Sequence, residues 1–226
     1  MAKYNIAETF VSLNGEGPRT GQLAYFVRFA GCNLTCSFCD TTWANDTEKL
    51  EKFETMTEHQ IYEGIRLSGV TNITITGGEP MLQPDISVLL ELLVSDELLN
   101  IEIETNGSID LQPFEKLQSS GRLNFTVDYK LPSSSMEIMM RVSNFDLLKK
   151  SDTVKFVAGS ISDLERAQTV IDAYNLSDKC NVLISPVYGE LKPEQIADFI
   201  KEHKLNKTGL QIQLHKLLWG AYARGV

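Results

Sequence analysis

The sequence predicts an α/β fold, in the form of an open, partial barrel of about six parallel strands. Strand-like and helix-like stretches alternate along the chain, which is the pattern of βαβ units and of a parallel sheet. The chain has 226 residues, whereas a closed eight-stranded barrel usually needs about 250. Because no repeat, low-complexity tract or linker interrupts the sequence, we expect one domain over residues 1–226.

The expected strands are short runs rich in β-branched, aromatic and other apolar residues. The first strong run is AYFVRF, and the two that follow it along the chain are NITIT and NIEIE. Six to seven strands fit in all. They are expected at residues 24–29, 72–76, 100–104, 124–128, 153–157, 181–187 and 210–214.

The expected helices carry local start signals. Thr57 and Gln60 have capping-box spacing, and so do Ser162 and Glu165. Pro193 suits the first turn of a helix, where its missing N–H costs nothing. The helices are expected at residues 57–68, 85–93, 111–119, 162–174 and 192–203, of which the third has the weakest pattern.

The charge and hydropathy of the chain exclude several classes of partner. Lys and Arg number 21 against 30 Asp and Glu, which gives a formal net charge of −9. An acidic protein is poorly suited to nucleic acid or to an anionic membrane, because phosphate contacts need clustered Lys and Arg. No apolar run approaches the roughly 20 residues of a membrane span. Residues 1–8 lack the apolar region of a signal peptide, so we expect a cytoplasmic protein.

Three of the four cysteines lie within eight residues, in the loop after the first strong strand. Cys32, Cys36 and Cys39 have C-x3-C-x2-C spacing, which is too close for a disulfide framework and typical of metal binding. Three thiolates can hold three irons of a cubane and leave the fourth open to a small molecule. The alternative is a zinc site completed by a distant histidine or by Cys180. Since Cys180 precedes an expected strand, it belongs at the opposite end of the sheet, where a buried free thiol is expected.

This cysteine loop resembles the signature of the radical S-adenosylmethionine (SAM) superfamily, and Phe38 before the last cysteine fits the pattern. The resemblance implies the radical SAM core, a partial TIM-like barrel. It also implies a [4Fe-4S] cluster on residues 32–39, whose open iron is chelated by the amino and carboxylate groups of SAM. The reduced cluster then cleaves SAM and yields a 5′-deoxyadenosyl radical.

A second motif, TGGEP, follows the NITIT run. Alone it is compatible with an ordinary strand-to-helix turn, in which Gly and Pro are common. One βα unit after the cysteine loop, it resembles the GGEP motif of radical SAM enzymes. The resemblance implies that Gly78 and Glu79 hold the amino group of SAM, since glycine lets a ligand approach the backbone closely.

Three further strand ends carry polar residues that we expect near SAM, because ligands of parallel folds gather at the carboxyl ends of the strands. For each, a plain turn or a solvated side chain is the alternative. Glu104 begins an ETNG stretch that could reach the SAM ribose or the substrate, and the backbone of residues 185–188 could contact adenine. The expected SAM-binding residues at these ends are Glu104, Asp128, Tyr129, Lys130, Ser185, Pro186, Val187 and Tyr188.

Motifs near both ends of the chain narrow the resemblance. The SLNGEG stretch at residues 12–17, Arg28, the Asp40-Thr41 pair and the QLHKLLWG stretch at residues 213–220 occur in order. Together they resemble the 7-carboxy-7-deazaguanine synthase family of queuosine and 7-deazapurine biosynthesis, over nearly the whole chain. That family usually has Gln where this chain has Asn14, so the loop backbone is a safer substrate contact than this side chain.

The resemblance implies a ring contraction of 6-carboxy-5,6,7,8-tetrahydropterin to 7-carboxy-7-deazaguanine, with loss of ammonia and regeneration of SAM. Arg28 would pair with the substrate carboxylate, and Glu16 with the 13–15 backbone would bind the pterin edge. Mg²⁺, held partly by the Thr41 hydroxyl, is also implied, as are an electron donor such as flavodoxin and a homodimer. The segment 210–226 would cap the substrate. The expected substrate-binding residues are Leu13, Asn14, Gly15, Glu16, Arg28, Thr76 and His215.

Structural alternatives remain for two of these residues, because Arg28 could form a surface ion pair and Thr41 could cap a helix. Two alternatives also remain for the function. Glycyl-radical-enzyme activases of the anaerobic ribonucleotide reductase type share the C-x3-C-x2-C spacing in a chain of similar length. They act on a protein loop, and the Gly-Glu-Gly stretch and Arg28 are not expected in them. A zinc- or cluster-binding interaction module without catalytic activity is the other alternative.

Overall fold

A computed structural model describes residues 1–45, 53–221 and 223–226, which build one continuous sheet of nine strands in the order β3-β1-β2-β4-β5-β6-β7-β8-β9. The strands from β2 to β9 in this order are parallel, whereas β1 pairs antiparallel with β2 and with β3. Because β3 and β9 are the two edges, the barrel is open. The strands are β1 (Lys3–Leu13), β2 (Leu23–Phe29), β3 (Glu54–Thr57), β4 (Asn72–Gly77), β5 (Asn100–Thr105), β6 (Leu123–Tyr129), β7 (Thr153–Ala158), β8 (Asn181–Pro186) and β9 (Thr208–Leu210).

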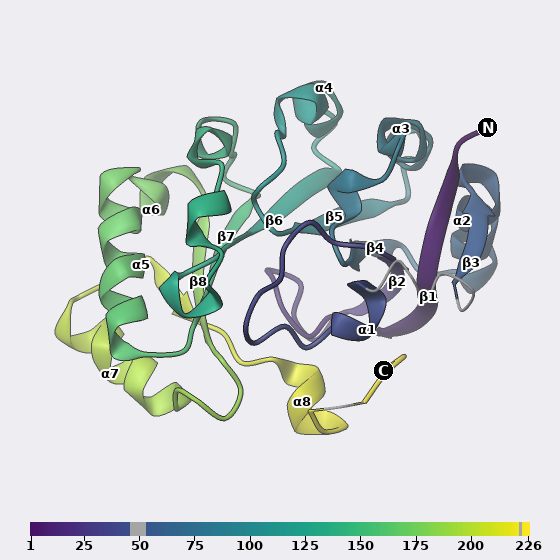
Figure 1. Ribbon diagram of the computed structural model, residues 1–226. Coiled ribbons are helices and arrows are strands. Elements are labelled where there is room, and N and C mark those ends of the chain that lie inside the picture. The colour runs from purple at the N-terminus through teal and green to yellow at the C-terminus, as the bar shows by residue number, and fades with distance from the viewer. Residues whose placement is uncertain (46–52, 222) are drawn as a thin grey trace.

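Helices connect successive parallel strands and pack outside the curved sheet, while the loop between β2 and α1 lies within its curve (Figure 1). Short 3₁₀ turns at 80–82, 112–114, 132–134, 137–139 and 142–146 complete the connections. No membrane-spanning helix occurs among the residues that the structure describes. The helices are α1 (Thr42–Asn45), α2 (Glu58–Ser68), α3 (Ile86–Ser95), α4 (Glu115–Gln118), α5 (Ile161–Ala173), α6 (Leu176–Lys179), α7 (Pro193–Glu202) and α8 (Leu214–Leu218).

The interior strands are apolar where they pack against the helices. Ile73 and Ile75 on β4, Ile101 and Ile103 on β5 and Phe156 on β7 are almost completely buried. Burial of such side chains is the main stabilising contribution to a sheet covered by helices. Polar side chains replace them toward the carboxyl ends of β4 to β7, which is where the candidate site lies.

Most of the expected elements are confirmed, including the α/β class, the open barrel and the capping box of Thr57 and Gln60 at α2. The cap of α5 was predicted wrongly. Ser160 has extended backbone, and its hydroxyl accepts a hydrogen bond from the Asp163 N–H, so this helix begins before Ser162. The 111–119 helix is divided into a 3₁₀ turn and the single turn of α4.

The two ends of the chain differ most from the expectation. The first strand is not the 24–29 run but β1, so the 12–17 stretch joins β1 to β2 instead of preceding the sheet. The expected strand at 210–214 is also wrong. Only β9 pairs with β8. The Gln211 N–H still donates to Ile184 O of β8 at 2.9 Å, while the Gln211 side chain hydrogen-bonds to Gly17, and the chain leaves the sheet after this residue. His215 therefore lies in the first turn of α8 and not at the end of a strand.

Candidate active site at the carboxyl ends of the strands

A cavity of ≈ 610 Å³ opens at the carboxyl ends of the central strands, within the usual size range for small-molecule sites. Its walls come from the loop after β1, the cysteine loop, the ends of β4 to β7, and the C-terminal segment. The predicted residues that line it are Leu13, Gly15, Glu16, Arg28, Cys32, Cys36, Cys39, Thr41, Thr76, Gly78, Glu104, Asp128, Lys130, Val187, Tyr188 and His215.

All three clustered cysteines face this cavity, and the sulfurs of Cys32 and Cys39 accept hydrogen bonds. Cys32 Sγ accepts from Leu34 N at 3.4 Å and from Asn106 Nδ2 at 3.6 Å, and Cys39 Sγ accepts from Asn45 Nδ2 at 3.5 Å. Such donors favour thiolates and tune iron–sulfur centres. Burial raises the pKa of the Cys32 thiol, so a metal's positive charge is needed to keep it deprotonated. The donor set thus fits a cluster with three protein ligands.

The described residues do not bring three His, Cys, Asp or Glu side chains together around a single ion. The separation of the three cysteines is compatible with a cubane, because each cysteine would bind a different iron. Cys180 is buried at the amino end of β8, as expected, where its thiol donates to Leu176 O at 3.6 Å.

The TGGEP turn packs directly against the cysteine loop. A Cβ on Gly77 would lie 2.2 Å from Phe29 O, and one on Gly78 would lie 1.9 Å from Gly31 O. Gly77 also has a φ of 139°, which disfavours other residues. Backbone N–H groups of Gly78 and Glu79 donate to Phe29 O and Gly31 O at 3.0 and 2.8 Å. The two motifs therefore form one structural unit, with the Gly78 backbone on the cavity wall.

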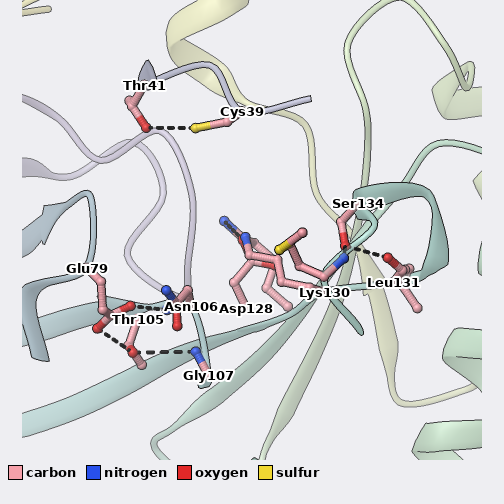
Figure 2. A network of polar contacts seen from close by, with 12 residues as sticks. Cys39, Thr41, Glu79, Thr105, Asn106, Gly107, Asp128, Lys130, Leu131 and Ser134 are labelled. Carbon is pink, nitrogen blue, oxygen red and sulfur yellow. Dashed lines mark hydrogen bonds and ion pairs between the residues drawn. The ribbon is translucent and has the colours of Figure 1, made fainter. Parts of the chain in front are cut away.

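The Glu79 side chain does not line the cavity and is fully buried. Its Oε1 accepts from Met81 N at 2.9 Å. Thr105 Oγ1 also donates to Oε1, at 2.8 Å, and Asn106 N donates to Oε2 at 2.6 Å (Figure 2). Glu79 thus ties the ends of β4 and β5 together. Burial raises its pKa to about 7, against the opposing effect of these hydrogen bonds.

This raised pKa predicts a pH-dependent contribution to stability. Between the ordinary value of 4.5 and about 7, folded Glu79 retains a proton that the unfolded chain has released. Stability therefore falls as pH rises through this window, by up to about 3 kcal/mol. Glu79→Gln has no ionisable group at this position. The amount by which the unfolding free energy of the wild type exceeds that of Glu79→Gln should therefore decrease from pH ~5 to pH ~7.5. Denaturant unfolding of both proteins in the same loading state tests this, and a constant difference would contradict it.

Successive residues at the end of β6 point to opposite faces. Asp128 and Lys130, the residue after the strand, line the cavity and pair at 2.7 Å (Figure 2). Tyr129 instead packs on Phe145 and Phe156 and donates to Glu137 Oε1 at 2.9 Å. The structure therefore does not bring the Tyr129 side chain to the site. This follows from the period of two in a strand.

The floor of the cavity is a charged layer. Lys155, on β7, is buried and contacts Glu16 directly, and its Nζ lies 3.8 Å from Asp128 Oδ2. Although burial opposes the charge, Glu16 and Asp128 raise the pKa of Lys155. Burial raises the pKa of the neighbouring Glu104, and the Thr76 hydroxyl beside it opposes that shift.

The loop after β1 brings some predicted residues to the site but not others. Leu13, Gly15 and Glu16 line the cavity, whereas the Asn14 side chain is buried and accepts a hydrogen bond from Thr74 Oγ1 at 2.7 Å. Asn14 therefore supports the loop and does not face a ligand. Both carboxylate oxygens of Glu16 are engaged, Oε2 by Lys155 and Oε1 by the amide of Gln213.

Arg28 and Thr41 lie on the cavity wall in different surroundings. Arg28 Nε donates to Glu8 Oε1 at 2.9 Å, which leaves the two terminal nitrogens of its guanidinium for another partner. Thr41 Oγ1 lies 3.7 Å from Cys39 Sγ (Figure 2). Beside it, Asp40 pairs with Lys216 at 2.9 Å. The predicted ion-pair alternative for Arg28 is thus present in the structure, but inside the cavity.

The C-terminal segment closes the remaining side. Leu214 N donates to Gly15 O at 3.0 Å, and the His215 ring packs against Gly15. Farther on, the Arg224 guanidinium lies 4.3 Å from the Trp43 ring centroid, so the end of the chain approaches α1 (Figure 1). Tyr222 falls outside the described residues.

The end of β8 contributes less than predicted. Val187 and Tyr188 line the cavity, whereas Ser185 and Pro186 do not. The Ser185 hydroxyl is buried without a hydrogen-bond partner among the described residues.

Sequence reasoning missed several cavity residues, chief among them Lys155. A lysine in the otherwise apolar TVKFVA strand was the available signal, since a buried lysine requires partners. Glu8 was missed together with β1. Gln213 was read only as part of a tail motif, because its contact with Glu16 spans most of the chain.

Known proteins with similar sequences belong to the family that the motifs of the site resemble. The Radical SAM superfamily model matches residues 26–151. A 7-carboxy-7-deazaguanine synthase from Clostridium acetobutylicum is 52% identical and covers 99% of both chains. Another, from Methanospirillum hungatei, is 38% identical over 94% of this chain and 84% of its own. The crystal structure of QueE from Escherichia coli matches with a TM-score of 0.74 and 21% identity, over 93% of this chain and 94% of that one.

These matches favour the synthase interpretation over an activase or a zinc module, and the family carries with it a [4Fe-4S] cluster and SAM. The match with QueE, at its low identity, shows the fold alone. The sequence matches agree with the cysteine loop, the TGGEP turn and the cavity, and they show that the chain belongs to the radical SAM superfamily and, within it, to the 7-carboxy-7-deazaguanine synthase family.

Proposed function

We propose that this enzyme converts 6-carboxy-5,6,7,8-tetrahydropterin to 7-carboxy-7-deazaguanine and ammonia. The observation that carries the proposal is one cavity in which Arg28 and Glu16 face the same space as the three cysteines. An arginine fork suits the substrate carboxylate, and a carboxylate suits the donor edge of the pterin. The 52% identity over the whole chain to a protein named for this product supports it.

In this proposal the substrate lies between the loop after β1 and the C-terminal segment. The terminal nitrogens of Arg28 bind its carboxylate, since Glu8 occupies only Nε. Glu16 and the backbone of residues 13–15 bind the edge that carries the amide and amino groups. Thr76 approaches from β4, and His215 covers the far side.

SAM occupies the other half of the cavity, beside the cysteine loop. The backbone at Gly78 contacts its amino group, and Glu79 acts indirectly by holding the turn in shape. Lys130, paired with Asp128, suits its carboxylate or ribose. Glu104 lies within reach of the ribose or the substrate, and the backbone around Val187 and Tyr188 is assigned to adenine.

When bound, the cluster held by Cys32, Cys36 and Cys39, together with SAM, would supply the radical chemistry that removes a hydrogen atom from the substrate. Substrate and product differ by one molecule of ammonia, so the conversion needs no net oxidant or reductant and SAM can be regenerated. The protein residues bind and orient the substrate, and the segment from Gln211 onward excludes water from the cavity. An electron donor such as flavodoxin and a homodimeric assembly belong to the same proposal.

Mg²⁺ is expected near Thr41, where the cavity wall offers oxygen ligands. Thr41 offers one hydroxyl oxygen, and Asp40 lies next to it in the chain. A site with few protein ligands suits Mg²⁺, which retains water and substrate oxygens.

Thr41→Ala should lower the turnover rate and raise the Mg²⁺ concentration needed for half-maximal activity, because one oxygen ligand is lost while the thiols remain. Iron content should match the wild type. Titration of activity with Mg²⁺ measures this, and Thr42→Ala, on the exposed neighbouring residue, is a matched control. An unchanged Mg²⁺ requirement would leave Thr41 with a structural role.

The decisive experiment for the function is anaerobic incubation of the cluster-loaded protein with SAM, reductant, Mg²⁺ and the carboxytetrahydropterin. Mass spectrometry should detect 7-carboxy-7-deazaguanine, and ammonia should form in equal amount. An activase would instead introduce a radical into a protein partner. SAM cleavage without conversion of the pterin would refute the substrate and keep the superfamily assignment.

A further inference from the structure

Resting on the proposed function, we infer that Lys155 is a positioning residue that makes Glu16 a selective receptor for the amide-and-amino edge of the pterin. Lys155 itself does not need to touch the substrate. It fixes the direction and charge of the carboxylate that does. The substrate class this selects is a 2-amino-4-oxo heterocycle, as opposed to a 2,4-dioxo heterocycle of the same shape.

The geometry places Glu16 in a clamp. Lys155, from β7, holds Oε2, and the Gln213 amide, from the segment before α8, holds Oε1. Each carboxylate oxygen has a second lone pair, so the group can still accept two parallel N–H bonds from a ligand. Gln211 fixes the same loop by two hydrogen bonds with the Gly17 backbone, at 3.0 and 3.1 Å. Glu16 is therefore held from both sides before any substrate arrives.

The charges explain why the lysine is needed. Glu16 shares the cavity floor with two other carboxylates, Glu104 and Asp128. Asp128 has Lys130 as its own partner at 2.7 Å. Lys155 is the cation in direct contact with Glu16, and it is buried. Without it, a carboxylate among like charges and away from water takes up a proton.

Protonation of Glu16 would change what the site recognises. An ionised carboxylate accepts from both the ring N–H and the amino group of a pterin, but meets a carbonyl oxygen at the same position in a lumazine. A neutral carboxyl group carries a donor and can satisfy that carbonyl. A site whose ionised carboxylate pairs with N–H donors of the ligand strongly rejects an analogue that presents a carbonyl oxygen there. A site with a neutral carboxyl group rejects that analogue only weakly.

The test compares two unreactive ligands, 6-carboxypterin and 6-carboxylumazine, by isothermal titration calorimetry on the cluster-loaded protein with SAM. The wild type should bind the pterin at least ~100-fold more tightly than the lumazine. Lys155→Met should weaken pterin binding by about 30-fold or more, with little change for the lumazine, so that the selectivity falls. A general loss of structure would weaken both ligands equally. Lys116→Met, at an exposed lysine on α4, should leave both affinities unchanged.

A double-variant cycle shows whether the effect passes through Glu16. If Lys155 acts by positioning Glu16, the double variant Lys155→Met/Glu16→Gln should bind the pterin no more weakly than Glu16→Gln alone. Independent, additive losses would overturn the inference, as would retained selectivity in Lys155→Met. Should Lys155→Met fail to fold, the double variant removes both charges of the pair and decides the same question by comparison with Glu16→Gln.

If the wild type converts the carboxytetrahydropterin but the variants do not behave as expected, the inference alone is wrong. If the wild type neither binds the carboxypterin nor converts the substrate, the proposed function is wrong.

Discussion

Replacement of Cys32, Cys36 or Cys39 by alanine is expected to abolish cluster loading and, with it, all SAM cleavage. Each thiol faces the cavity from the same loop, and a cubane with only two protein ligands and two open irons lacks a stable attachment. Anaerobic reconstitution followed by iron and sulfide analysis measures the first effect. Release of 5′-deoxyadenosine or methionine measures the second. Both should fall to the background of a protein-free control.

Cys180→Ala is the matched control, because this thiol is buried at the opposite end of the sheet and contacts Leu176 O. It should load iron normally and cleave SAM at the wild-type rate. Loss of the cluster in Cys180→Ala, with retention of the fold by circular dichroism, would indicate a four-thiolate structural site. The radical SAM chemistry of this chain would then need another explanation.

The sequence was sufficient for the cluster loop and the TGGEP turn because their information is local. Cysteine spacing fixes which thiols can share a cluster. The TGGEP motif can be recognised from its own residues, although the close contacts that require Gly77 and Gly78 are with Phe29 and Gly31 and appear only in the structure. The order of the parallel strands likewise follows from alternation along the chain. These features needed no knowledge of distant contacts.

Side-chain direction within strands can be predicted from the sequence alone. Adjacent residues of a strand face opposite sides, so the prediction that Asp128 and Tyr129 both bind SAM conflicts with this rule. The structure places Asp128 in the cavity and Tyr129 in the core. The same rule puts Lys155 on the cavity side once the register between β6 and β7 is known. That register pairs Asp128 with Lys155 directly.

The ends of the chain were poorly predicted because tertiary contacts determine them. β1 is half polar, and it becomes a strand by pairing with β2 and β3 on its two sides. The 210–214 stretch has strand-like composition, but the chain leaves the sheet after Gln211, whose side chain binds Gly17 across almost the whole sequence. Local propensity could not reveal either pairing.

Arg28→Ala is expected to weaken carboxypterin binding by about 2–5 kcal/mol, the usual cost of removing one partner from a buried charge pair. The Arg28 side chain is largely buried on the cavity wall, and Glu8 holds its Nε at 2.9 Å. The terminal nitrogens can then form a bidentate pair with a carboxylate. SAM cleavage in the absence of substrate should persist, because the cysteine loop is untouched.

Two comparisons separate the guanidinium fork from its charge and from general effects of losing an arginine. Arg28→Lys retains a positive charge but not the two parallel donors, so it should recover only part of the affinity. Arg66→Ala removes an arginine that pairs with Asp96 on the surface, and it should bind 6-carboxypterin normally by calorimetry.

A change of ligand provides the last check. Pterin without the 6-carboxylate should bind wild type and Arg28→Ala equally, because the group that Arg28 recognises is missing. A similar loss of affinity for both ligands would place the substrate carboxylate elsewhere in the cavity.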